Sequence, residues 1–66
     1  MNVNKKYVIK RAESTHYCSG ILQWNPHLEN ALIFDEEWYC LEFIKSDKAT
    51  LDKGERLLIL PIYNTI

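Results

Sequence analysis

Three consecutive acidic residues, Asp35–Glu37, stand directly before an aromatic-rich segment, and this feature most constrains the fold. Asp35 is a good N-cap, and carboxylates are stabilised at the positive end of a helix dipole. The side chains that follow recur at helical spacing on one side. That side carries Phe34, Trp38, Leu41 and Lys45. The sequence therefore predicts a helix that begins at Asp35 and ends near Ser46.

The same segment has a second interpretation. Residues 38–45 (W-Y-C-L-E-F-I-K) contain aromatic and β-branched residues, which favour strands. As a strand they could pair with residues 57–63 across a long loop. The preceding acids and the helical spacing favour the helix, and the strand remains the alternative.

Short β-type segments surround the predicted helix. The predicted strands span residues 6–11, 16–23, 31–34 and 56–63. Gly20 marks a possible bulge in the second strand, and residues 24–30 form a turn or a single helical turn. Pro61 requires that its end of the last strand either lie at a sheet edge or leave the sheet. We expect one α+β domain spanning residues 1–66, a small antiparallel sheet of three to four strands with one helix packed on a face, in the order β-β-(β)-α-β.

The chain has 66 residues, and a domain of that length rarely gains more than about 3–5 kcal/mol from one core. Cys18 and Cys40 are its two cysteines, and one disulfide could stabilise the fold by about 2–4 kcal/mol. Two buried thiols are more typical of a chain without a secretory signal. Whether the two cysteines pair stays open.

His16 and Cys18 would share one face of a strand, and His27 with Cys40 could complete a set of four zinc ligands. Such sites usually begin with a closely spaced pair such as C-x2-C, which this chain lacks. We therefore predict no metal and no cofactor. Two glycines cannot form a phosphate-binding loop, and no spacing of serine and histidine indicates a catalytic pair, so we do not expect an enzyme.

No apolar run approaches the roughly 18–20 residues that span a bilayer. Residues 1–11 are polar and basic, and no apolar signal-peptide region follows them. We expect a cytoplasmic protein without a membrane partner.

The predicted helix is apolar around most of its circumference, because Tyr39 and Phe43 lie about 100° or more from Trp38. Residues 26–28 or the C-terminal tail could cover these rings. Alternatively they contact a second protein, since aromatic residues are favoured in interface cores. The predicted protein interface consists of Trp38, Tyr39, Phe43, Glu36 and Glu42. A homodimer through it would also stabilise so short a chain.

Basic residues concentrate near the start of the chain, where residues 1–28 carry a net charge of +3 and residues 29–66 one of −4. An alternative function is therefore a nucleic-acid-associated module. Its contacts would be Lys5, Lys6, Lys10 and Arg11. A pI of about 6.0 argues against it, because domains built for nucleic acid usually lie above about pH 9.

The order of the short motifs Y-V-I-K, Y-C-S-G, a tryptophan and A-L-I-F-D-E-E resembles small, mostly uncharacterised proteins of bacteriophages and their hosts. The matching positions are Tyr7, Ile9, Tyr17, Ser19, Gly20, Trp24, Ala31, Phe34 and Asp35. In that pattern an alanine follows the acids, whereas Trp38–Cys40 stand here. The resemblance implies binding to a host protein and inhibition of it in the host cytoplasm, with antiviral defence factors as candidates, the Hachiman system among them. It supplies no catalytic or binding residue.

Overall fold

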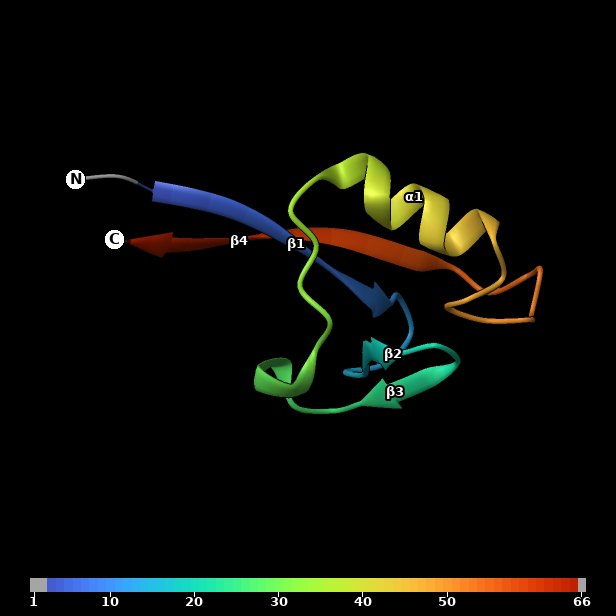
Figure 1. Ribbon diagram of the computed structural model, residues 1–66. Coiled ribbons are helices and arrows are strands. Elements are labelled where there is room, and N and C mark those ends of the chain that lie inside the picture. The colour runs from blue at the N-terminus through green and yellow to red at the C-terminus, as the bar shows by residue number, and fades with distance from the viewer. Residues whose placement is uncertain (1–2, 66) are drawn as a thin grey trace.

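The computed structural model describes the backbone of residues 3–65 and the side chains of residues 5–63. A four-stranded antiparallel sheet carries one α-helix on one face (Figure 1). The elements are β1 Val3–Arg11, β2 Tyr17–Gly20, β3 Gln23–Asn25, the 3-10 helix η1 Leu28–Asn30, α1 Glu37–Lys45 and β4 Leu57–Thr65. The predicted α+β class, with one helix on a small antiparallel sheet, is confirmed.

The longest part of the sheet is the antiparallel pair of β1 and β4, whose register runs from Val3↔Thr65 to Arg11↔Leu57. The strand order β3-β2-β1-β4 places β4 at an edge, as Pro61 predicts. Tyr7, the partner of Pro61, directs its backbone N–H and C=O toward Phe34 instead. The Tyr7–Pro61 pair is therefore a non-hydrogen-bonded one, and the N–H that proline lacks would point away from the sheet.

The predicted third strand at residues 31–34 is wrong in extent. Its backbone bonds are divided between two strands, so no continuous ladder forms. The Leu32 N–H donates to the Cys18 carbonyl in β2 at 2.9 Å, while Phe34 and Tyr7 of β1 exchange two hydrogen bonds of 2.8 and 2.9 Å. The segment thus fills the space where β2 diverges from β1, and only the bridge Tyr7↔Phe34 is strand-like.

The third strand is β3, which begins at the last residue of the predicted second strand and continues into the predicted turn at residues 24–30. The chain reverses at Ile21 and Leu22, and Leu22 has a positive φ of 55°. Neither residue type favours such a turn, so the sequence gives no turn signal there. The register between β2 and β3 shifts between Cys18 and Gly20, at the irregularity that Gly20 predicts.

The helix is confirmed, and the strand alternative for residues 38–45 is wrong. It begins two residues later than predicted, with Glu36 at the N-cap and no side-chain capping bond. The Asp35 carboxylate instead accepts a bond of 2.7 Å from Lys6 Nζ. Within residues 3–65, no helix has the length and apolar character to cross a membrane.

The core lies between α1 and the sheet. Ile9, Cys18, Cys40 and Ala49 are fully buried there, and Phe43 and Ile44 pack against them. The helix therefore faces the sheet through residues 40, 43 and 44. Phe34 belongs to the bridge rather than the helix, and its ring meets Phe43 edge to face at 5.3 Å. Trp38 and Leu41, on the side that the helical spacing emphasised, are exposed.

Ile9 is the largest fully buried side chain in this core, so Ile9→Ala should lower the free energy of unfolding by about 2–5 kcal/mol. For a domain this small that is a large share of the total stability. Urea denaturation measures the loss. Leu51→Ala, at a side chain that is 67% exposed, is the control and should change stability by less than about 0.5 kcal/mol. Equal effects of the two substitutions would contradict the placement of the core.

Candidate functional site

The outer side of α1 carries two aromatic rings that face solvent. The Trp38 and Tyr39 side chains are 54% and 46% exposed, and their rings stack with centroids 3.9 Å apart and an interplanar angle of 28°. Leu41 is 49% exposed and lies one helical turn from Trp38. Stacking reduces the water contact of each ring but leaves the pair uncovered on its outer side.

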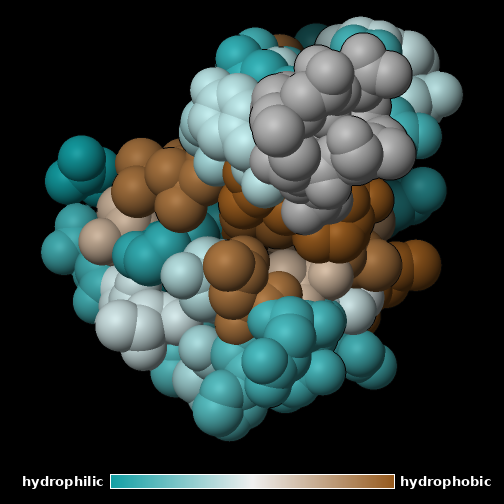
Figure 2. Space-filling model, turned by 90° about the vertical axis from the view of Figure 1, so that its left-hand side faces the viewer, coloured by the Kyte–Doolittle hydropathy of each residue, from teal (hydrophilic) through white to brown (hydrophobic). Residues whose placement is uncertain are grey.

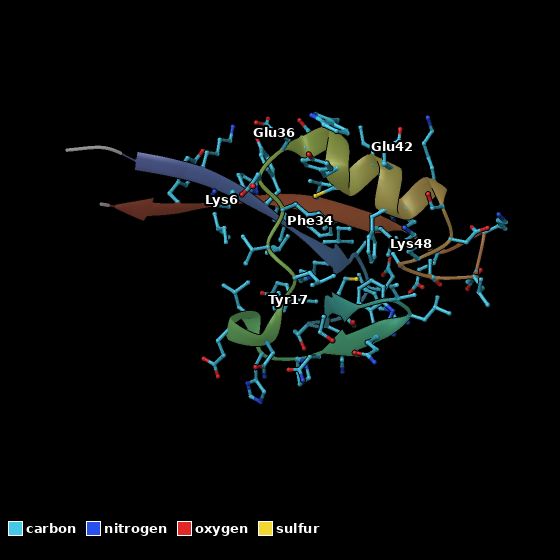
Figure 3. All side chains as sticks on the ribbon, viewed as in Figure 1. Lys6, Tyr17, Phe34, Glu36, Glu42 and Lys48 are labelled. Atoms are coloured by element: carbon cyan, nitrogen blue, oxygen red, sulfur yellow. The ribbon has the colours of Figure 1, made fainter. Side chains whose placement is uncertain are left out.

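Two exposed carboxylates lie near this aromatic pair in the sequence of the helix. Glu36 and Glu42 are exposed, and Figure 3 shows both on the side of α1 that points away from the sheet. Glu42 is four residues from Trp38 and three from Tyr39, so it neighbours both on the helix surface. We call Glu36, Trp38, Tyr39, Leu41 and Glu42 the helix surface. It combines an apolar aromatic centre with the carboxylates of Glu36 and Glu42, and the exposed Lys45 lies one helical turn from Leu41 on the same side.

The structure brings four of the five predicted interface residues together. The exception is Phe43, which is half-buried in the core against Phe34. The sequence did not predict Leu41 as an interface residue, because helical spacing placed it on the same side as Phe34. Residues 40, 43 and 44 are spaced i, i+3, i+4 and form a second apolar stripe that could face the core. Choosing that stripe as the buried side would have placed Leu41 on the exposed side.

The four basic residues of the alternative nucleic-acid site do not form one patch. Alternation along β1 places Lys5 and Arg11 on the core side of the sheet and Lys6 and Lys10 on the other. Arg11 lies over the Trp24 ring at 4.3 Å and pairs with Glu55 at 2.8 Å.

The other three basic side chains are also engaged within the molecule. Lys5 lies over the Tyr7 ring at 5.6 Å, Lys6 pairs with Asp35, and Lys10 Nζ donates to the Arg11 carbonyl at 2.9 Å. These four residues therefore do not form a groove of unpaired cations that could bind a phosphate backbone.

The four candidate zinc ligands are not gathered into a site. Cys18 and Cys40 are free thiols in the core, His16 contacts the Ser14 hydroxyl at 3.3 Å, and His27 lies exposed beside η1. Among the side chains that the structure describes, no group of three or more His, Cys, Asp or Glu could hold a metal ion.

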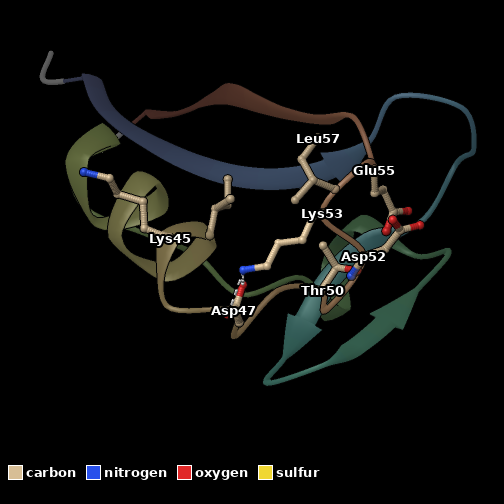
Figure 4. A pocket seen from close by; sticks show the side chains of 8 residues that line it. Lys45, Asp47, Thr50, Asp52, Lys53, Glu55 and Leu57 are labelled. Carbon is tan, nitrogen blue, oxygen red and sulfur yellow. Dashed lines mark hydrogen bonds and ion pairs between the residues drawn. The ribbon is translucent and has the colours of Figure 1, made fainter.

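A pocket of about 230 Å³ lies between the end of α1 and the loop before β4 (Figure 4). Several of its charged side chains make contacts within the molecule. Lys53 Nζ donates to both Asp47 carboxylate oxygens at 3.0 and 3.2 Å, and the Asp52 carboxylate accepts the Gly54 N–H at 2.9 Å.

Comparison of the chain with protein-family models, with curated proteins and with solved structures gave no match. The exposed aromatic pair and its acidic neighbours are thus the features from which function is inferred.

Burial raises the pKa of the Cys40 thiol to about 11, and the nearby Glu37 carboxylate adds to the effect. The unfolded chain ionises this thiol near the ordinary value of 9.0, while the folded chain holds it neutral. The contribution of Cys40 to stability is therefore complete below about pH 9 and is lost as the pH rises through about 11.

We predict that the free energy of unfolding of the wild type falls more steeply between pH 9 and 11 than that of Cys40→Ala. Urea denaturation of both proteins across this range measures the two slopes. All other residues are common to the two proteins, so the difference between the slopes reports Cys40. Parallel slopes would show that Cys40 is not held neutral by the fold.

Proposed function

We propose that this chain is a small accessory protein of the phage type that binds and inhibits a host antiviral defence factor and works as a homodimer. The observation that carries the proposal of protein binding is the exposed, stacked pair of Trp38 and Tyr39 on α1. Tryptophan and tyrosine are the residues most enriched among those that dominate binding energy at protein interfaces. The resemblance of the chain to small phage proteins supports the choice of a host factor.

The chemistry of the helix surface defines the partner. Trp38, Tyr39 and Leu41 need an apolar pocket to cover them, and Glu36 and Glu42 favour a basic rim around that pocket. A nucleic-acid-binding groove on a host protein combines these properties. Occupying such a groove would block its nucleic acid, which is a direct mechanism of inhibition.

The outer position of the aromatic pair also favours a role in binding over a role in folding. The helix already packs on the sheet through Cys40, Phe43 and Ile44, so removing the Trp38 and Tyr39 rings leaves the core intact. Their substitution should therefore separate loss of binding from loss of structure.

We expect Trp38→Ala with Tyr39→Ala to abolish inhibition while the protein stays folded. Truncation of each such anchor costs about 2 kcal/mol or more, which is roughly a 30-fold loss of affinity per residue. The measurement is plaque formation by a defence-sensitive phage on a panel of bacterial strains. Each strain carries one antiviral defence system together with the wild type, the double variant or the control Leu51→Ala.

The wild type and Leu51→Ala should restore plaques on at least one strain, and the double variant should not. Circular dichroism of the purified variants confirms that each is folded. Failure of the wild type on every strain would refute the role against host defence, and full activity of the double variant would refute the role of the helix surface.

A further inference from the structure

One arginine of the chain is held between an aromatic ring and a carboxylate. Arg11 Cζ lies 4.3 Å from the centroid of the Trp24 ring, and Arg11 Nε lies 2.8 Å from a carboxylate oxygen of Glu55. A guanidinium suits both contacts, because it is flat and weakly hydrated and can stack on an indole while its N–H groups meet a carboxylate. The fold itself therefore contains an arginine bound by a tryptophan and a glutamate.

The helix surface offers the same two partners without a cation. Tyr39 stacks on one side of the Trp38 ring, and the Trp38 side chain remains 54% exposed. Glu42 follows one helical turn after Trp38 and neighbours both rings. Among the side chains of residues 5–63, the cations over aromatic rings are Lys5 and Arg11, and the ion pairs are those of Lys6, Arg11, Lys53 and Arg56. None of these cations contacts the two rings or Glu42.

Lys45, the last residue of α1, does not supply the missing cation. It lies seven residues beyond Trp38, which is about 10 Å along the helix axis. Its charge instead lies in the last turn, where a helix favours a cation. A cation over the Trp38 ring must therefore come from another molecule.

The charges around the rings favour such a cation. Glu36, Glu37 and Glu42 are exposed, whereas Lys45 is the one basic residue in the segment 36–45. Figure 2, viewed from the end of the molecule where both termini lie, shows hydrophobic atoms gathered across its middle and hydrophilic atoms above them, on the side where α1 lies in Figure 1. The rings thus stand in a polar and mainly acidic surrounding, which suits a flat cation better than an aliphatic side chain.

We propose that the helix surface binds an arginine side chain of the target, with the guanidinium over the Trp38 ring and paired with the Glu42 carboxylate. The inference deepens the proposed function and rests on it, since this arginine belongs to the basic rim of the host protein. Tryptophan is the ring that binds a cation best, and arginine is enriched among the residues that dominate binding energy at interfaces.

The arginine comes from a different protein rather than from a second copy of this chain. The two arginines of the chain are both engaged in ion pairs within the molecule, Arg11 with Glu55 and Arg56 with Glu13. A lysine of the target is the less suitable occupant, because its ammonium is compact and strongly hydrated and cannot stack on a ring while forming two parallel bonds to a carboxylate.

The test is an NMR titration of the ¹⁵N-labelled protein with two peptides of equal charge, in which four arginines or four lysines alternate with glycine. The arginine peptide should bind saturably and shift the indole N–H signal of Trp38, which is identified by its loss in Trp38→Leu. The lysine peptide should bind roughly threefold more weakly or worse, because the ammonium stacks poorly.

Three variants separate the contacts. Glu42→Gln should raise the dissociation constant of the arginine peptide about two- to fivefold, as expected for an exposed ion pair. Glu29→Gln, at an exposed residue of η1, makes the same change in net charge and should leave the constant unchanged. Trp38→Leu keeps an apolar side chain without the ring and should weaken binding at least as much as Glu42→Gln. Circular dichroism checks that each variant is folded.

No saturable binding of the arginine peptide, equal affinity for the two peptides, or unchanged binding by Trp38→Leu would overturn the inference. Equal effects of Glu42→Gln and Glu29→Gln would also overturn it, because net charge alone would then explain the binding. Should Trp38→Leu not fold, the comparison of these two glutamine variants decides.

The titration and the plaque assay fail independently. Restored plaques together with a failed titration would overturn arginine recognition and leave the role against host defence standing. Arginine binding by a protein that restores plaques on no strain would overturn that role and leave the recognition of arginine standing.

Discussion

Two hydrogen bonds between Tyr7 and Phe34 hold the segment before α1 against strand β1. They occupy the edge of β1 that β2 leaves free, since β2 pairs with β1 only at Lys10↔Tyr17. They also hold the chain beside the sheet just before α1 begins. Phe34 is thereby placed against Phe43, and Asp35 beside Lys6. The position and rotation of the helix follow from this one crossing point.

The rotation of α1 determines which of its aromatic residues can act on another molecule. A helix lying on one sheet buries only one stripe, and here Cys40, Phe43 and Ile44 occupy it. Trp38, Tyr39 and Leu41 are left outside, where they can be covered only by each other or by another protein. The exposed rings are thus a consequence of the core and not a defect in it.

The parts of the fold that local chemistry determines could be predicted from the sequence. The pattern of residue types predicted the two long strands. Pro61 indicated the edge position of β4, and the acids before Trp38 predicted the helix. The parts set by tertiary contacts could not. Ile21 and Leu22 form a turn without turn residues, and Asp35 binds Lys6 across 29 positions instead of capping. The apolar circumference of the helix predicted Trp38 and Tyr39 as interface residues, but helical spacing did not predict that Phe43 lies in the core.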